Sequence, residues 1–244
     1  MRKILFPVAG CLLLATVSSE ATIIDGQVND ITGFSGEAFD QGGEFRLLDL
    51  PFDPPAGGEN EVGQDTFQTP NLYGFDEEQN VEFGEDGEIR VDILPSADIP
   101  FLGGRLTQDD SSVVASHYIF FDPEDSTRIN GTVNFDSDIL GIITSTEKLA
   151  ESDFLANTGV TYLNPSARGF EAVDSVRVLA DGRSLQVNLQ ASSPGDFFRV
   201  LTTFSPGADG DPADDEPTAV PEPGTLGLLA LGLLGVGAAR RRKT

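Results

Sequence analysis

The chain has 244 residues, of which 39% are apolar and 8% aromatic, enough for the core of one domain of about 200 residues or of two small ones. Residues 22–219 contain nine basic and 38 acidic side chains, a net charge of −29, so this stretch repels nucleic acid and anionic lipid and attracts cations or basic partners. The only cysteine is Cys11 and the only histidine is His117, which excludes a disulfide framework and a multi-histidine zinc site.

The first 21 residues have the pattern of a Sec signal peptide. Arg2 and Lys3 precede the apolar stretch 4–17, and small residues end at Ala21, after which signal peptidase is expected to cut. A lipoprotein signal ending at Cys11 is the alternative, but the apolar run continues directly after that cysteine. The pattern therefore predicts a signal helix at 1–21 and passage through the Sec translocon.

Residues 22–204 are expected to form an acidic, β-rich extracellular domain. Glycine and proline are frequent up to residue 85, which predicts long loops with short strands. Further on, alternating or β-branched runs predict strands. These runs are Glu88–Leu94, Val113–Phe121, Ile129–Phe135, Ile139–Thr144 and Asp196–Phe204.

Two local elements stand out in the second half of the domain. Residues 147–156 are the only helical candidate, with Leu149, Phe154 and Leu155 as its apolar positions. Residues 176–189 form a hairpin pattern around Asp181-Gly182, which favours a two-residue type I′ turn. Strands joined by short turns, with one helix, predict an all-β fold, an antiparallel sandwich or jelly roll.

Two groups of carboxylates follow neighbouring predicted strands. Asp122 and Asp125 come after the first of these strands, and Asp136 and Asp138 after the second. Their loops could converge on one Ca²⁺, the only cofactor that the sequence suggests, because carboxylates are preferred ligands of this ion. Solvated loop ends are the plainer interpretation, and a carboxylate pair of a glycoside hydrolase is a third.

The sequence contains no recognisable catalytic pattern, and we expect a protein that is not an enzyme. A triad would have to use His117 with a serine such as Ser111 or Ser112, and no nucleophile-elbow motif surrounds any serine. Tyr73, Tyr118 or Tyr162 could stack on sugars if they were exposed, which would suit a carbohydrate-binding module.

The end of the chain has three parts in sequence. Residues 205–219 are rich in proline, glycine and acids and predict a solvated linker. The motif Val220-Pro221-Glu222-Pro223 comes next, followed by the apolar stretch 226–239. As a helix, these 14 residues would span roughly 21 Å, short for a membrane core of about 30 Å. The basic cluster Arg240-Arg241-Arg242-Lys243 would stay cytoplasmic by the positive-inside bias.

Residues 220–244 resemble the PEP-CTERM sorting signal, on the strength of this Pro-Glu-Pro motif, apolar helix and arginine cluster in the same order. The resemblance implies export in a Gram-negative bacterium, a transient anchor in the inner membrane through a C-terminal transmembrane helix, and processing by exosortase.

The favoured hypothesis is a non-enzymatic protein of the cell surface or extracellular matrix. The alternatives are a Ca²⁺-dependent module that binds extracellular polysaccharide and a secreted glycoside hydrolase. Saturable retention on a polymer that EDTA abolishes would indicate the binding module, and release of soluble product would indicate the hydrolase.

Overall fold

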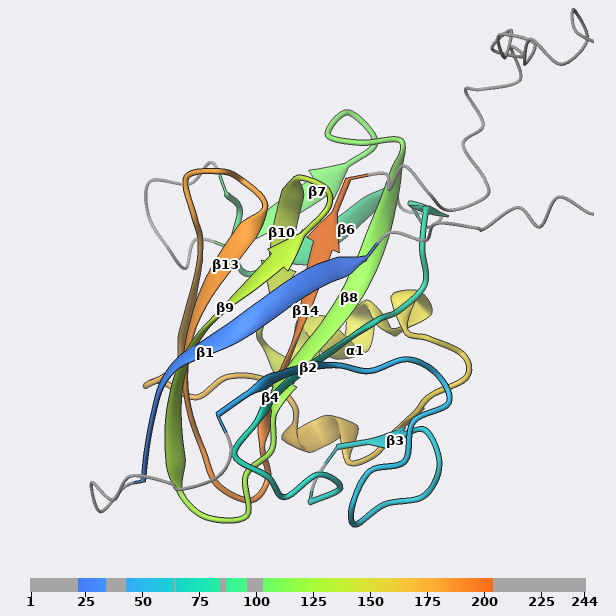
Figure 1. Cartoon of the computed structure of the whole chain (residues 1–244). Coiled ribbons are helices and arrows are strands. Elements are labelled where there is room, and N and C mark those ends of the chain that lie inside the picture. The colour runs from blue at the N-terminus through green and yellow to red at the C-terminus, as the bar shows by residue number, and fades with distance from the viewer. Residues whose placement is uncertain (1–21, 34–42, 64, 84–86, 96–102, 204–244) are drawn as a thin grey trace, which may run out of the picture. The chain divides into compact units, whose positions relative to one another are not determined.

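The computed structural model describes residues 22–33, 43–63, 65–83, 87–95 and 103–203. These residues form fourteen β-strands, one α-helix and two short 3-10 helices, which confirms the all-β prediction (Figure 1). The predicted signal peptide, linker and sorting segment lie outside the described residues. No helix within the described ranges is long and apolar enough to cross a membrane.

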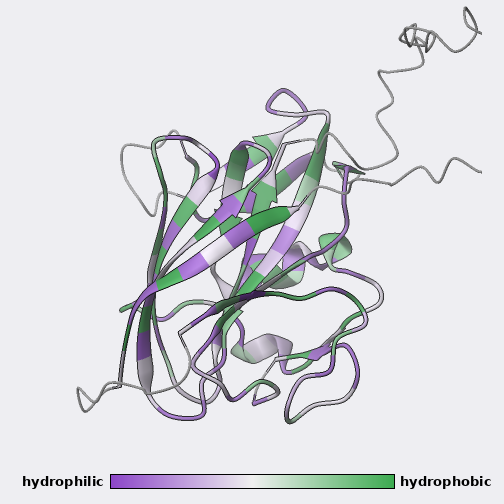
Figure 2. Ribbon diagram, viewed as in Figure 1, coloured by the Kyte–Doolittle hydropathy of each residue, from purple (hydrophilic) through white to green (hydrophobic). Residues whose placement is uncertain are grey.

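Sheet A has four antiparallel strands. Its order is β1 (Ile23–Gly33), β9 (Thr127–Phe135), β13 (Ser184–Ala191) and β12 (Ser175–Val178). In β9 and β13 most of the apolar residues alternate with polar ones, which gives each strand one buried and one open face (Figure 2). This alternation is the reason that the sequence predicted both strands.

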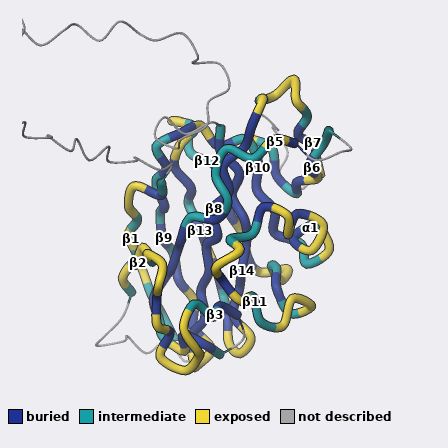
Figure 3. Tube along the Cα trace, turned by 90° about the vertical axis from the view of Figure 1, so that its right-hand side faces the viewer, coloured by how far each residue is buried: buried dark blue, intermediate teal, exposed yellow. Residues whose placement is uncertain are grey.

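The central strands of sheet B are buried on both faces. Its order is β10 (Ile139–Ile143), β14 (Asp196–Thr202), β8 (Val113–Phe121), β4 (Leu72–Asp76) and β2 (Phe45–Leu47), and β5 (Val81–Glu82) also pairs with β8. The pairing is antiparallel except between β2 and β4. Every residue of β8 and β14 is buried, as the dark tube through the centre of Figure 3 shows. Both strands are therefore rich in apolar residues on each face.

The two faces of sheet B belong to two different apolar cores. Ile119 and Phe121 of β8 pack toward sheet A, together with Phe198 and Val200 of β14. Side chains of sheet A complete this core, including Ile129, Val133, Leu185, Val187 and Leu189. Sheets A and B are thus the two halves of a β-sandwich.

A third layer covers the far face of sheet B, the face turned away from sheet A. Tyr118, Phe120 and Phe197 lie on this face with buried side chains of the third layer, such as Val62, Leu149 and Leu155. The layer consists of the parallel pair β3 (Glu61–Val62) and β11 (Thr161–Tyr162), the hairpin β6 (Glu88–Val91) and β7 (Gly104–Thr107), the helix α1 (Thr146–Glu151), and the 3-10 helices η1 (Asp153–Leu155) and η2 (Pro165–Ala167).

Two local predictions need correction. The helix ends at Glu151 and gives way to η1, so that Leu149 and Leu155 are buried while Phe154 is 49% exposed. The hairpin is confirmed, but Gly182 alone of the two turn residues has positive φ. The Asp181 carboxylate accepts the backbone N–H groups of residues 183 and 184, each at 3.0 Å, and thereby stabilises a longer turn than type I′.

The first strand is the largest element that the sequence did not predict. β1 extends over eleven residues in a region expected to hold loops and short strands. Its exposed side includes Asp25 and Asn29, which are weak strand formers. Pairing along β9 over nearly its whole length stabilises this strand, an interaction that local sequence does not reveal.

Candidate functional site

A fully buried ion pair lies on the far face of sheet B. Arg199, in the middle of β14, donates from Nε to Glu77 Oε2 at 2.5 Å and from Nη2 to Glu77 Oε1 at 2.8 Å. Both side chains are 0% exposed. Because the two bonds are parallel and charge-assisted, the geometry is that of a strong bidentate pair.

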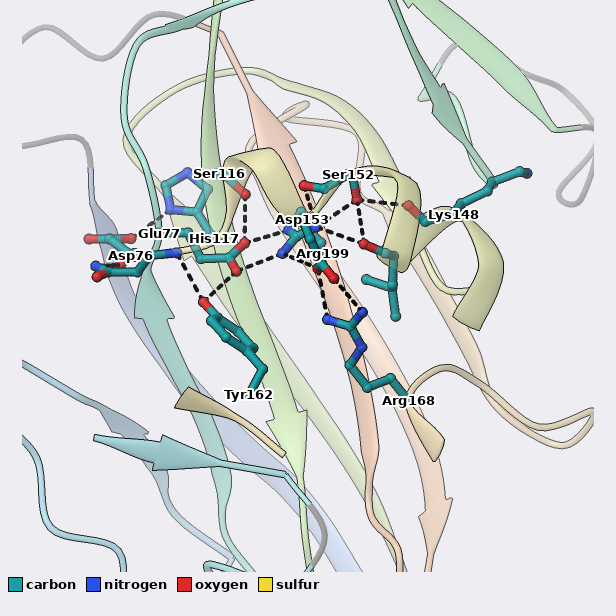
Figure 4. A network of polar contacts seen from close by, with 12 residues as sticks. Asp76, Glu77, Ser116, His117, Lys148, Ser152, Asp153, Tyr162, Arg168 and Arg199 are labelled. Atoms are coloured by element: carbon teal, nitrogen blue, oxygen red, sulfur yellow. Dashed lines mark hydrogen bonds and ion pairs between the residues drawn. The ribbon is translucent and has the colours of Figure 1, made fainter. Parts of the chain in front are cut away.

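Both partners of the ion pair have further hydrogen bonds (Figure 4). Tyr162 donates to Glu77 Oε1 and Ser116 to Glu77 Oε2, each at 2.7 Å. Arg199 Nη1 donates to the backbone oxygen of Ser152 at 2.8 Å and to its hydroxyl at 2.6 Å. The pair therefore ties the centre of sheet B to the end of helix α1 and to β11.

A second arginine extends this arrangement. Arg168 donates to both carboxylate oxygens of Asp153, each at 2.9 Å, and Asp153 Oδ1 lies 3.5 Å from Nη2 of Arg199. The guanidinium carbon of Arg199 is 5.9 Å from the centre of the Tyr118 ring, and burial raises the pKa of that tyrosine. We call the set the outer network; it consists of Glu77, Ser116, Ser152, Asp153, Tyr162, Arg168 and Arg199.

The outer network has the properties of a structural connection. Its charges are paired and hydrogen-bonded, as buried charges must be. Removal of one member would leave the others desolvated without partners, so the network strongly favours one placement of the third layer on sheet B.

His117 lies on the opposite face of sheet B, toward the sandwich core. Hydrogen bonds join its Nδ1 to Asp76 Oδ1 at 2.6 Å and its Nε2 to Thr202 Oγ1 at 3.0 Å. The partner hydroxyl is thus that of Thr202 rather than Ser111, whose Oγ donates to the backbone oxygen of Val113. A carboxylate, an imidazole and a hydroxyl in this order resemble a catalytic triad. However, His117 and Thr202 are both 0% exposed, so their arrangement joins β4, β8 and β14 inside the core.

The four carboxylates predicted to share a Ca²⁺ do not come together. Asp122 follows the end of β8, and Asp136 follows the end of β9, so the nine residues of β9, about 30 Å of extended chain, separate them. Asp138 accepts a hydrogen bond from Arg183 at 2.7 Å, and Asp125 is exposed. No group of three or more potential ligands from histidine, cysteine and carboxylates occurs in the part of the chain that the structure describes.

The tyrosines proposed to stack on sugars are not available for that role. Tyr73 and Tyr118 are 3% and 1% exposed, and Tyr162 packs edge-on against Tyr118 at a centroid distance of 5.2 Å. All three belong to the aromatic core on the far face of sheet B or lie against it. A stacking platform of these residues would require the third layer to open.

The open face of sheet A has an unusual composition for such an acidic protein. Side chains pair across its strands in three polar rows. These rows are Gln27, Thr132, Gln186 and Arg177; Asp30, Asn130, Asn188 and Ser175; and Thr32, Arg128 and Gln190. We call this surface the amide face, because seven side-chain amides lie on it: Gln27, Asn29, Asn130, Asn134, Gln186, Asn188 and Gln190.

The amide face is electrically neutral. The four strands of sheet A contain two acids, Asp25 and Asp30, and two arginines, Arg128 and Arg177. The amides interact laterally: Asn29 Nδ2 donates to Thr132 Oγ1 at 3.2 Å. The result is a neutral sheet surface of donors and acceptors on a body whose net charge is −29.

A small pocket opens beside helix α1. Its volume is about 320 Å³, and Asp92, Lys148, Phe170 and Asp174 are among the lining residues. The pocket contains the only lysine of residues 22–219, and this Lys148 donates to Asp92 Oδ1 at 2.5 Å and to the backbone oxygen of Val91 at 2.9 Å. The ammonium group is therefore already paired.

The comparisons with known proteins concern the end of the chain. Residues 219–243 match the family described as PEP-CTERM protein-sorting motif. No curated protein and no solved structure matches the chain. The motif implies sorting by exosortase and export to the cell envelope. This confirms the resemblance seen at Val220-Pro221-Glu222-Pro223, whereas the cleavage site at Ala21 lies outside the described residues.

Sequence reasoning missed the outer network. Arg199 interrupts the apolar run Phe197–Leu201, and a lone charge in such a run is a sign of a buried ion pair. Its partner Glu77 is 122 residues away, in a region where no buried acid was expected. Identifying the partner requires the register of β4, β8 and β14.

Proposed function

We propose that the chain is an exported protein of the cell surface or extracellular matrix, processed by exosortase at its Pro-Glu-Pro signal, with a non-enzymatic interaction role. The sorting motif supports the exported location. The amide face, neutral on a strongly acidic body, supports the interaction role and is the observation on which it depends.

The partner that best suits the amide face is an uncharged stretch of extracellular polysaccharide. Planar amides both donate and accept hydrogen bonds, as sugar hydroxyl groups do. A polyanion would meet the field of the surrounding acids, whereas a neutral polyhydroxyl chain would not. The strands of sheet A repeat these groups in register, so that an extended polymer could contact several rows at once.

The test is a pull-down of the full-length chain on the extracellular polysaccharide of the producing cell. Gln186→Ala combined with Asn188→Ala removes two neighbouring amides from the middle of the face. Retention should weaken about tenfold, because each lost hydrogen bond contributes about 1 kcal/mol or less. Gln108→Ala removes an exposed amide elsewhere and should leave retention unchanged.

Three outcomes would contradict the polysaccharide assignment. The first is absence of retention by the unmodified chain. The second is equal retention of the double variant and the Gln108 control. The third is self-association that Gln186→Ala with Asn188→Ala abolishes, because the occupant of the face would then be a second copy. Soluble sugar released during the incubation would instead contradict the non-enzymatic role.

A further inference from the structure

The carboxylate of Asp122 is enclosed by a loop of the third layer. Asp122 directly follows β8, and its side chain is 0% exposed. Its Oδ2 accepts the backbone N–H of Phe67 at 3.0 Å, and the amides of Asp65 and Gln68 also donate to the carboxylate. The backbone N–H of Thr69 donates to the Asp122 carbonyl oxygen at 3.0 Å. The loop thus fixes one side of the carboxylate.

The other side of this carboxylate has no partner. Oδ1 of Asp122 is buried and accepts no hydrogen bond, and the same is true of Oδ1 of Asp65. The two buried oxygens without partners belong to residues in direct contact, because the backbone N–H of Asp65 donates to the Asp122 carboxylate.

Such an arrangement favours a bound proton or a cation at the two oxygens. Buried polar atoms in folded proteins nearly always have a partner, and an uncompensated buried carboxylate is costly. A cation between the two Oδ1 atoms would satisfy both and would cancel their repulsion. The amide of Phe67 donates to Oδ2 of Asp122 and leaves its Oδ1 available for an ion.

We propose that Asp65 and Asp122 bind one Ca²⁺ ion. Ca²⁺ accepts carboxylate, backbone carbonyl and water oxygens in flexible numbers, which suits a loop with two acids better than the strict octahedron of Mg²⁺. Because only two carboxylates contribute, we expect weak binding, with a Kd on the order of 0.1–1 mM. The site retains one of the four acids that the sequence suggested and adds Asp65.

The test measures calcium binding by calorimetry on the full-length chain in detergent, after removal of metals with EDTA. Asp65→Asn is the main variant, because asparagine tolerates the positive φ of 62° at this position. Asp109→Asn removes the same charge from an exposed position and is the matched control. Far-UV circular dichroism verifies that both variants are folded.

The unmodified chain and the Asp109 control should show one saturable site and a higher Tm in Ca²⁺ than in EDTA. Asp65→Asn should weaken binding at least tenfold. No saturable binding to the unmodified chain would overturn the proposal. So would equal binding by the two variants, or the same Tm increase with Mg²⁺ at equal ionic strength, which would indicate general screening of the 40 acids of the full-length chain.

Discussion

Replacement of Arg199 by methionine tests the outer network. Methionine has similar length and no charge, so the change removes five hydrogen bonds and leaves the Glu77 carboxylate buried without its counter-charge. Breaking a buried ion pair in this way costs about 3–5 kcal/mol. A domain of this size is stable by about 5–15 kcal/mol, so Arg199→Met should be folded but severely destabilised.

The assay is equilibrium unfolding in urea, followed by far-UV circular dichroism and by tyrosine fluorescence. Tyrosine is a clean probe, because the chain has no tryptophan and Tyr73 and Tyr118 are buried. Arg183→Met is the control, because Arg183 pairs with Asp138 on the surface. The urea midpoint of this variant should barely differ from that of the unmodified chain. The m-value should be the same for all variants if the folded and unfolded states expose the same surface areas as in the unmodified chain.

A double-mutant cycle with Glu77→Met separates the interaction energy of the ion pair from the effect of each substitution alone. The double variant should recover much of the loss, because no unpaired charge remains, although Ser116 and Tyr162 lose their acceptor. A cost below about 1 kcal/mol for Arg199→Met, or costs of the single variants that simply add, would refute the view that the pair acts as a unit.

Three further outcomes are expected. Burial, with Asp174 and Glu171 nearby, raises the pKa of Asp196 to about 8. The folded chain therefore keeps this proton, while the unfolded chain loses it near pH 4. The free energy of unfolding should then fall between about pH 4 and 8, by at most about 1.4 kcal/mol per pH unit. Asp196→Asn should reduce this dependence on pH, measured by urea unfolding at several pH values. Leu149→Ala should cost about 2–5 kcal/mol in the same assay, since this side chain is 0% exposed, and a smaller loss would mean that the third layer packs loosely. Pro221→Ala with Pro223→Ala should leave the chain unprocessed in the membrane fraction on immunoblots, whereas processing as in the Pro217→Ala control would contradict recognition of the motif.

The sequence predicted those parts of the fold in which local pattern and burial agree. Hydrophobic runs identified β8 and β14, and alternation identified β9 and the β12–β13 hairpin. β1 was missed because pairing with β9 stabilises it against its own weak propensity. The turn at Asp181 was misassigned because a side-chain hydrogen bond changed the backbone geometry that the dipeptide favours.

The site depends on contacts between distant parts of the chain, which explains why less of it was predicted. Glu77 and Arg199 meet only because β4 and β14 lie on either side of β8. Asp122 was recognised as an acid at a strand end, but its neighbour Asp65 comes from a loop 57 residues earlier, and local spacing contains no trace of that contact. The sorting motif was recognised because it is a contiguous stretch.

The place of β14 in sheet B bears on when the domain can fold. This strand lies between β10 and β8 and supplies Arg199, yet it is the last strand along the described chain. Until the chain is complete to residue 202, sheet B lacks a central member and the third layer lacks its principal ionic contact. This order of strands therefore delays completion of the sandwich until nearly all of residues 22–203 are present. Only a short stretch then separates the completed sandwich from the Pro-Glu-Pro signal.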